Sequence, residues 1–258
     1  MQLSGLSVLL TRPQMQSASL VKAINSHGGQ VCELPLIEID PVDDPDACEA
    51  IKARILSLDQ YDAAIFISTN AARIALEWID AWWPQVPDGL AAYAVGPGTA
   101  QVLRALDWPV NCSDKGVTSE DLLALPGLQN ISGQRIALVR GVGGRELIAE
   151  TLRERGATVD YLELYHRRTP DYGTDMLLTM IRQQQINAIV VTSAQILDVL
   201  LHFLQNDPTT ITSIPVIVPS ERIRQHAINA GVVRVINAGG ANDETVLEAL
   251  ATVAVPLG

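Results

Sequence analysis

The feature that most constrains this chain is an internal repeat of a strand, a helix and a second strand. One copy reads VLLTRPQMQSASLVKAINSHGGQVCELPLIEI from Val8, and the other reads IALVRGVGGRELIAETLRERGATVDYLELYHR from Ile136. They align without a gap at an offset of 128 residues, which places Arg12 on Arg140. Each copy has a short apolar strand, a turn, an amphipathic helix that ends at glycine, and a second strand.

Two further pairs of segments follow in the same order. YDAAIFISTNAARIALEWI matches INAIVVTSAQILDVLLHFL, with Ser68 on Ser193 at an offset of 125 residues. AAYAVGPGTAQVLRALDWP matches PVIVPSERIRQHAINAGVV, with Gly96 on Ser220 at an offset of 124 residues. Slowly shrinking offsets are typical of two diverged copies that have lost a few loop residues, so we infer an internal duplication.

The repeated pattern predicts an α/β fold. Strands such as AAIFIS and AIVVTS are short, apolar and β-branched, which is typical of strands buried on both faces. Their alternation with helical patterns predicts right-handed βαβ units and parallel sheets. The stretches 36–46 and 165–174 are rich in proline and charge and occupy equivalent places in the two copies. We therefore expect linkers there, joining two similar lobes with a cleft between them.

Composition narrows the class of protein. The 258 residues are 48% hydrophobic and 18% charged, which excludes disorder and allows one large unit or two domains. The net charge of −11 argues against nucleic acid or an anionic membrane as a partner, although local arginines can still hold a small anion. We expect no signal peptide and no membrane span. Three cysteines without a CxxC pair indicate reduced thiols in a cytosolic protein: Cys32, Cys48 and Cys112.

The candidate site lies at the carboxyl ends of the predicted strands, where parallel sheets bind ligands. These ends read LLTRPQ, FISTNA, AVGPGTA, LVRGVGGRE, VVTSAQ and IVPSERI, and each precedes a helix whose first N–H groups can bind anions. Six hydroxyl side chains there are either parts of anion sites or ordinary helix N-caps: Thr11, Ser68, Thr69, Thr99, Ser193 and Ser220. As a set, they favour a cleft of anion sites.

Arginines at or beside the same ends can supply bidentate carboxylate contacts. They are Arg12, Arg140, Arg145, Arg167, Arg168 and Arg222. For three of them a solvated surface position is equally open: Arg145, Arg167 and Arg168.

Familiar catalytic motifs are absent from the sequence. The segment RGVGGREL has Glu146 where a dinucleotide fingerprint needs its last glycine, and no GxxxxGK[ST] occurs. The histidines lack metal-ligand spacing and are expected on the surface or in helix packing: His27, His166, His202 and His226. The acidic residues of the first linker are expected to be solvated: Asp43, Asp44 and Asp46.

One candidate acid remains. Tyr165 ends the second strand of the second copy, where the first copy has Ile37. A phenol is protonated at pH 7 and can donate a proton or a hydrogen bond to a leaving oxygen. The alternative is a strand-end tyrosine that packs its ring and exposes its hydroxyl to water. The sequence leaves both interpretations open.

Taken in order, these segments resemble the uroporphyrinogen-III synthase family. The resemblance covers nearly the whole chain, through VLLTRPQ, FISTNAA, AVGPGTA, TSEDLLAL, RGVGGRELIAETLRERGA, ELYHRR, VVTSAQ, PSERI and NDETVLEAL. It implies two flavodoxin-like lobes joined by a two-stranded connector. One lobe would combine residues 1–36 with 170–258, the other would hold 40–164, and the linkers would lie near 36–40 and 164–170.

The resemblance also implies an activity. A lyase of this family takes hydroxymethylbilane, expels its terminal hydroxyl as water, inverts the last pyrrole ring through a spiro intermediate and closes the macrocycle. The product, uroporphyrinogen III, enters haem, sirohaem and corrinoid synthesis. No cofactor or metal is implied. We expect a cytoplasmic monomer without nucleic-acid or membrane partners, in transient contact with the preceding enzyme of the pathway.

Residue roles follow from the matched motifs. Tyr165 matches the tyrosine of the family that assists departure of the terminal hydroxyl of the bilane. The implied substrate-binding residues are Thr11, Arg12, Ser68, Thr69, Asn70, Gly96, Thr99, Arg140, Ser193, Ala194, Ser220 and Arg222. The match weakens at VVTSAQIL and PSERI, which leaves the roles of Ala194 and Ser220 open.

Two other functions fit a duplicated α/β chain. A two-lobed binding or sensor protein would hold a small anionic ligand without turnover. A flavodoxin-like domain that uses a nucleotide or flavin is disfavoured by the missing phosphate motifs and the 4% aromatic content.

Overall fold

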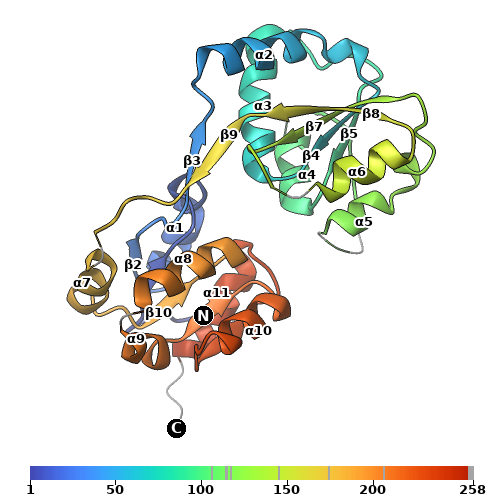
Figure 1. Cartoon of the computed structure of the whole chain (residues 1–258). Coiled ribbons are helices and arrows are strands. Elements are labelled where there is room, and N and C mark those ends of the chain that lie inside the picture. Colours follow the sequence, from blue (N-terminus) through green and yellow to red (C-terminus); the bar gives the residue numbers. More distant parts are fainter. Residues whose placement is uncertain are drawn as a thin grey trace. The chain divides into compact units, whose positions relative to one another are not determined.

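The computed structural model describes residues 1–105, 107–113, 116, 118–144, 146–173, 175–205 and 207–254 (Figure 1). The chain divides into two compact units: Met1–Glu38 with Arg168–Gly258, and Ile39–Arg167. Below, these are unit 1 and unit 2. Among the described residues, no helix is long and apolar enough to cross a membrane.

Unit 1 is built on a five-stranded sheet in the order β12-β11-β10-β1-β2. The strands are β1 (Ser7–Leu10), β2 (Gln30–Glu33), β10 (Ala188–Val190), β11 (Val216–Val218) and β12 (Val235–Asn237). Each strand is parallel to its neighbours, so the sheet unites the first strands of the chain with its last three.

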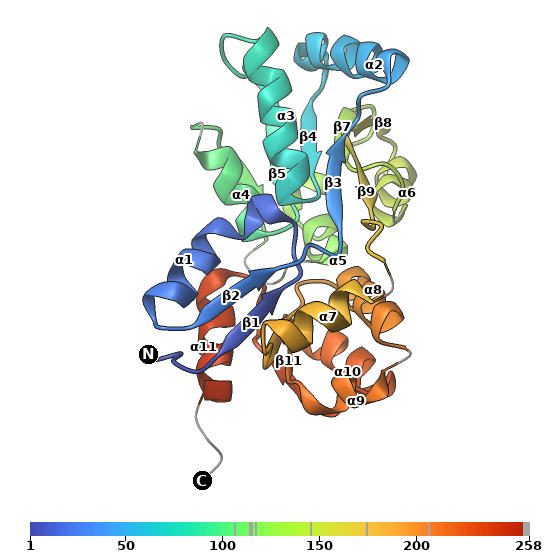
Figure 2. The same ribbon diagram turned by 90° about the vertical axis from the view of Figure 1, so that its left-hand side faces the viewer.

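Helices cover both faces of this sheet, as Figure 2 shows. They are α1 (Ala18–Ser26), α7 (Met176–Gln183), α8 (Ala194–Leu204), α9 (Pro208–Ser213), α10 (Glu221–Asn229) and α11 (Asp243–Ala254), with a 3-10 turn η1 (Gln14–Gln16). On one face, Leu20 of α1 and Leu250 of α11 pack against Leu10 and Val190. Helices α8 and α10 contact each other on the other face. Burial of apolar side chains on both faces explains why the strands are apolar throughout.

Unit 2 has a second parallel five-stranded sheet, in the order β6-β5-β4-β7-β8. Its strands are β4 (Ala63–Phe66), β5 (Ala91–Ala94), β6 (Val110–Cys112), β7 (Arg135–Arg140) and β8 (Thr158–Glu163). Its helices are α2 (Pro45–Leu56), α3 (Thr69–Trp82), α4 (Pro97–Arg104), α5 (Ser119–Leu123) and α6 (Leu147–Glu154), with 3-10 turns η2 (Leu58–Gln60) and η3 (Pro126–Leu128).

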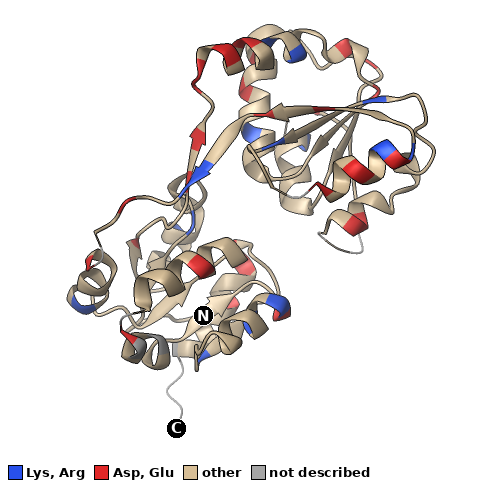
Figure 3. Cartoon of the chain, in the orientation of Figure 1, with Lys and Arg blue, Asp and Glu red and all other residues tan. Residues whose placement is uncertain are grey.

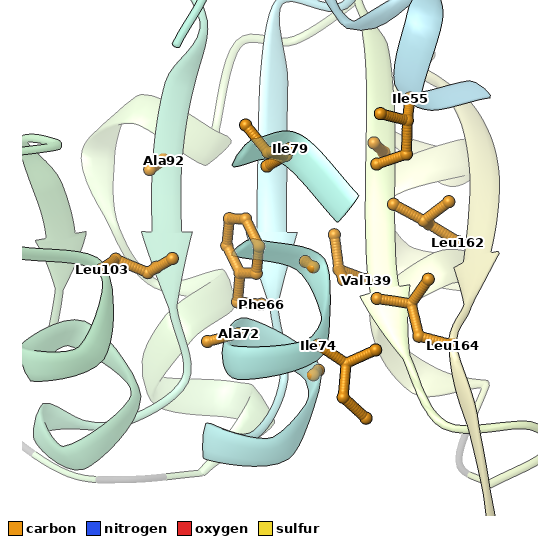
Figure 4. Close-up of a cluster of buried hydrophobic side chains, with 14 of the residues drawn as sticks. Ile55, Phe66, Ala72, Ile74, Ile79, Ala92, Leu103, Val139, Leu162 and Leu164 are labelled. Carbon is orange, nitrogen blue, oxygen red and sulfur yellow. The ribbon is translucent and has the colours of Figure 1, made fainter. Parts of the chain in front are cut away.

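Alternate residues of the unit 2 strands point to opposite faces. Phe66 and Val139 pack with Ile55 and Ile79 under helices α2 and α3 (Figure 4). Ile65 packs on the other face with residues of α5 and α6. The α/β class with parallel sheets is therefore confirmed.

The two sheets place equivalent strands in equivalent positions. The repeat aligns β1 with β7, β2 with β8, β10 with β4 and β11 with β5, and each sheet orders these partners identically. The duplication predicted from sequence therefore describes the sheets strand by strand.

The stretches expected to be linkers contain a third sheet. Strands β3 (Glu38–Pro41) and β9 (Tyr165–Arg168) form a two-stranded sheet apart from the other two. Its ends are tied by a hydrogen bond from Val42 N to Leu164 O of 2.9 Å and an ion pair of 2.8 Å between Arg168 and Glu38. Two extended segments that leave the five-stranded sheets satisfy their backbone groups by pairing with each other. The two-stranded connector that the resemblance to the family implies is therefore confirmed.

Candidate functional site

The predicted site residues gather at the carboxyl ends of the strands in each unit. In unit 2, Ser68 follows β4, Gly96 follows β5 and Arg140 ends β7. Because the strands of a parallel sheet end at one edge, these residues share that edge. Unit 1 repeats the arrangement with Thr11 and Arg12 after β1, Ser193 after β10 and Ser220 after β11.

Three of the predicted hydroxyls are helix N-caps. The side-chain oxygen of Ser68 accepts from Ala71 N at 3.0 Å, that of Ser193 from Ile196 N at 3.2 Å, and that of Ser220 from Ile223 N at 3.4 Å. Each cap satisfies one of the free N–H groups at a helix start. The remaining N–H groups still point beyond the strand end, where an anion can bind.

The glycine at the fourth equivalent position shares their backbone. Gly96 has φ −152° and ψ 166°, close to the φ −158° and ψ 159° of its repeat partner Ser220, but has no side chain to cap α4. The helix start is thus kept in both copies, with a side-chain cap in only one.

The predicted threonines are not caps. Thr11 is fully buried, and its hydroxyl donates to Val190 O at 2.7 Å, which ties β1 to β10. Thr99 is buried within α4, and Thr69 is the first residue of α3 and half-buried. The capping interpretation therefore holds for the serines only. Asn70 and Ala194 lie in the first turns of α3 and α8 and are half-buried.

Tyr165 is buried, although a strand end facing a cleft was expected. Its side chain is 0% exposed and belongs to the apolar cluster under α2 and α3. Its ring lies against the backbone of Gly141, where a Cβ atom would come within 2.6 Å of the ring. The neighbouring chain is fixed as well, because Val142 N donates to Tyr165 O at 2.8 Å.

The hydroxyl of Tyr165 is held by two polar side chains. It lies 2.9 Å from Ser68 Oγ, and Arg167 Nη2 donates to it at 3.0 Å. The Arg167 guanidinium also lies over the ring, 5.4 Å from its centre. All three residues belong to unit 2, so this cluster at the end of β4 is internal to one compact body. The ring of Tyr165 packs as the second sequence interpretation predicts, but its hydroxyl is not exposed to water as that interpretation expects.

Arg140 is buried and enclosed by its own loop. It is 1% exposed and pairs with Glu146 at 3.0 Å and with Glu163 at 3.8 Å. It also donates to Gly143 O. A Cβ at Gly144, whose φ is +106°, would come within 3.0 Å of Arg140 Nη2. The glycines of RGVGG therefore allow the loop to fold around the Arg140 guanidinium. The absence of a dinucleotide fingerprint in this segment gave no indication of that role.

A tyrosine completes the cluster around Arg140. The Tyr161 hydroxyl donates to Glu146, and this hydrogen bond, together with Arg140, holds the pKa of the Glu146 carboxyl below its ordinary value. Burial, and then the bond to Glu146, raise the pKa of Tyr161. The Glu146 carboxylate thus stays ionised beside the neutral phenol of Tyr161.

Arg12 has the equivalent role in unit 1. Its side chain is 6% exposed and pairs with Asp243 at the start of α11 at 2.9 Å. Its Nε is buried without a hydrogen-bond partner among the described residues, as is Ser17 Oγ. Two of the arginines predicted to bind substrate, Arg12 and Arg140, are therefore already paired with carboxylates of the protein.

The remaining predicted arginines that the structure describes are exposed. Arg222 lies in the first turn of α10, and Arg167 and Arg168 lie on β9. Arg145 lies outside the described residues. Basic and acidic residues are dispersed along the ribbon (Figure 3).

In the part of the chain that the structure describes, no three His, Cys, Asp or Glu side chains are grouped so that they could hold a metal ion. His226 lies 2.6 Å from Asp198, and His27 Nδ1 lies 2.8 Å from Ala23 O.

One hollow of unit 2 lies elsewhere. It has a volume of about 740 Å³ and is lined by Trp83, Leu90 and Trp108, where β5 and β6 begin. This is the opposite edge of the sheet from Ser68, and none of the predicted residues lines it. The candidate site is therefore defined by the polar side chains at the carboxyl ends of the strands and not by this hollow.

Comparison with known proteins identifies the family. The family model described as uroporphyrinogen-III synthase HemD matches residues 18–247. The uroporphyrinogen-III synthase of Escherichia coli strain K12 is 31% identical over 252 residues, which are 95% of this chain and 100% of that protein. The chain belongs to the uroporphyrinogen-III synthase family. The enzyme of Proteus mirabilis is 33% identical over 197 residues, 76% of this chain and 98% of that protein.

Solved structures of the family share the fold. A mutant uroporphyrinogen III synthase from the extremely thermophilic bacterium Thermus thermophilus has a TM-score of 0.66 at 17% identity, covering 96% of this chain and 98% of that chain. The Helicobacter pylori enzyme has a TM-score of 0.60 at 13% identity, covering 96% and 99%. The resemblance stated from the motifs is confirmed.

Membership of the uroporphyrinogen-III synthase family favours the enzyme over the sensor and the nucleotide-binding domain. It does not test the individual residues. The twelve substrate-binding assignments, the catalytic role of Tyr165 and the cleft stay predictions.

Proposed function

We propose that this chain converts hydroxymethylbilane to uroporphyrinogen III. The terminal hydroxyl leaves as water, the last pyrrole ring is inverted and the macrocycle closes. The observation that carries the proposal is the Tyr165 hydroxyl, held 2.9 Å from Ser68 and 3.0 Å from Arg167 at the carboxyl end of β4 in a chain of this family. A phenol beside a serine cap is a weak acid placed where an anion-binding helix begins.

The bilane carries many carboxylates, and the helix starts offer partners for them. Helices α3, α4, α8 and α10 each begin directly after a strand, at Ser68, Gly96, Ser193 and Ser220. Their free N–H groups and positive dipole ends stabilise negative charge without adding a cation. This suits a protein with a net charge of −11 whose buried arginines Arg12 and Arg140 are already paired.

Within this proposal the substrate-binding role rests first on those helix starts. Ser68, Thr69 and Asn70 would serve one carboxylate at α3, and Ser193 and Ala194 another at α8. Arg222, which is exposed in the first turn of α10, would supply a cation beside Ser220. Arg12 and Arg140 would act by fixing the strand ends.

Catalysis then consists mainly of positioning. The bilane closes without an enzyme to the uninverted isomer, so the protein has to fold a flexible polyanion such that the other carbon of the last ring attacks. Holding reacting groups in one geometry supplies much of the rate enhancement in such cases. Assistance to the leaving hydroxyl needs a proton donor and no metal.

The test is the isomer formed. Incubation of the purified chain with hydroxymethylbilane, followed by oxidation and chromatographic separation of the porphyrins, is expected to give the type III isomer in excess over type I. The same incubation without protein gives the type I reference. Formation of type I alone would exclude the proposed function.

Turnover distinguishes the proposed enzyme from the alternative, a non-catalytic sensor. A non-catalytic binding protein would bind the bilane without raising the yield of type III above the reference. A cytoplasmic location, a monomeric state and transient contact with the preceding enzyme stay predictions, and light scattering of the purified chain tests the second of them.

A further inference from the structure

The directions of the hydrogen bonds around Tyr165 follow from its partners. Arg167 has only N–H donors, so it must donate to the phenol oxygen, which it approaches at 3.0 Å. The Tyr165 proton then needs an acceptor, because the side chain is 0% exposed. Among the described residues, that acceptor is Ser68 Oγ at 2.9 Å. Tyr165 therefore donates to Ser68.

Counting the hydrogen bonds that the Ser68 oxygen accepts shows where its own proton can point. Its oxygen accepts from Tyr165 and from Ala71 N, which lies 3.0 Å away, and a serine oxygen has two acceptor positions. Its own proton must point elsewhere. Ser68 is half-buried, whereas Tyr165 has no exposed surface. The group that can donate to a ligand beyond β4 is therefore the serine.

We propose that Ser68 is the catalytic residue that contacts the leaving hydroxyl, and that Tyr165 and Arg167 are positioning residues that act through it. This inference rests on the proposed function and deepens it, because it assigns the contact to a different side chain of the same cluster.

The proton transfer balances along this chain. The carbon–oxygen bond of the hydroxymethyl group breaks, its electron pair stays on oxygen, and the pyrrole nitrogen supplies electrons to the carbon. The Ser68 proton moves to that oxygen, which leaves as water, and the Tyr165 proton moves to Ser68. The phenolate faces the Arg167 guanidinium. The proton released from the ring carbon when the macrocycle closes returns to Ser68 and then to Tyr165.

The repeat supplies a comparison within the chain. Ser193 caps α8 as Ser68 caps α3, but no tyrosine hydroxyl lies against it among the described residues. The change in thermal stability of Ser193→Ala therefore measures the effect of losing an N-cap alone. Tyr61→Phe is the matched control for Tyr165→Phe, because Tyr61 is 5% exposed in the same apolar cluster and its hydroxyl bonds to Asp160 at the opposite end of β4.

The experiment is a double-mutant cycle on the full chain with hydroxymethylbilane as substrate. Ser68→Gly keeps the helix start, since Gly96 has the same extended backbone there, and Ser68→Ala is the second variant. Loss of the donor is expected to lower kcat by about 10²-fold or more, the usual contribution of a general acid. Ser68→Thr is expected to restore most of the rate, and Tyr61→Phe to leave kcat unchanged.

The decisive comparison is Tyr165→Phe in the two backgrounds. It is expected to lower kcat when Ser68 is present and to change it less than twofold in the Ser68→Gly background. A solvent-isotope proton inventory is expected to be curved for the natural chain and linear for Tyr165→Phe, because two protons move in one step. A Tyr165→Phe effect of the same size in both backgrounds would overturn the inference, and so would a Ser68→Gly chain with full activity. The proposed function is judged separately, by whether the natural chain forms the type III isomer.

Discussion

The backbone of Gly141 lies directly against the ring of Tyr165. A Cβ atom at position 141 would come within 2.6 Å of Cε2 and 2.8 Å of Cζ. The end of β7 therefore sets the orientation of the ring, and the ring orientation sets the distance from the hydroxyl to Ser68. Gly141 is not required by a turn or a positive φ. Position 141 requires glycine because the ring of Tyr165 lies too close for a Cβ atom.

Gly141→Ala is expected to displace the Tyr165 ring. A buried ring under α2 and α3 cannot move freely, so overpacking should cost about 1–3 kcal/mol of unfolding free energy and lower kcat by breaking the contact with Ser68. Urea unfolding and the rate of uroporphyrinogen III formation measure the two effects. Gly173→Ala is the control, because nothing lies within 4 Å of its added Cβ. Equal stabilities for the two variants would contradict the close packing.

Asp243→Ala is expected to destabilise unit 1. It leaves the buried Arg12 guanidinium, already without a partner at Nε, lacking its 2.9 Å ion pair. Breaking a fully buried pair costs several kcal/mol, but the Asp243 side chain is 32% exposed, so we expect about 2 kcal/mol. The double variant Arg12→Met with Asp243→Ala should recover part of this loss in denaturant unfolding. An unchanged midpoint for Asp243→Ala would mean that the ion pair between Arg12 and Asp243 does not stabilise unit 1.

The sequence predicted the sheets because the repeat preserves local patterns. Short apolar runs before serine or glycine identified β4, β5, β10 and β11, and the alignment of the copies predicted which strands are equivalent. Even the burial of Tyr165 had a local signal, since its repeat partner Ile37 is aliphatic and is 4% exposed in the structure.

The partners of the site residues could not be predicted in the same way. Tyr165 meets Ser68 across 97 residues of sequence, and Arg12 meets Asp243 across 231. A single sequence shows that an arginine follows a strand but not whether a distant carboxylate neutralises it. This is why Arg12 and Arg140 were expected to face substrate. The residues of β3 and β9 by themselves indicated only linkers, and their pairing was expected from the resemblance to the family alone.

The caps predict a graded loss of stability. Ser220→Ala should cost about 1 kcal/mol, because Ile223 N loses its acceptor, whereas Ser220→Gly should cost only a few tenths of a kcal/mol. Gly96 shows that glycine supports the same backbone at the equivalent helix start. Thermal unfolding of the two variants checks the order. If the alanine variant were the more stable one, the cap at α10 would contribute nothing.

Alkaline pH is expected to weaken the fold through Tyr61. Burial, and then the bond to Asp160, raise the pKa of Tyr61 from 10.0 to about 12. Because the folded chain holds this proton more tightly, the contribution to stability is complete below pH 10 and is lost as the pH rises through 12. Between pH 8 and pH 11 the natural chain should lose about 1.4 kcal/mol more unfolding free energy than Tyr61→Phe. Urea unfolding at the two pH values measures this difference. Parallel losses in both chains would show that Tyr61 ionises equally in the folded and unfolded states, and that its hydrogen bond to Asp160 does not hold the proton.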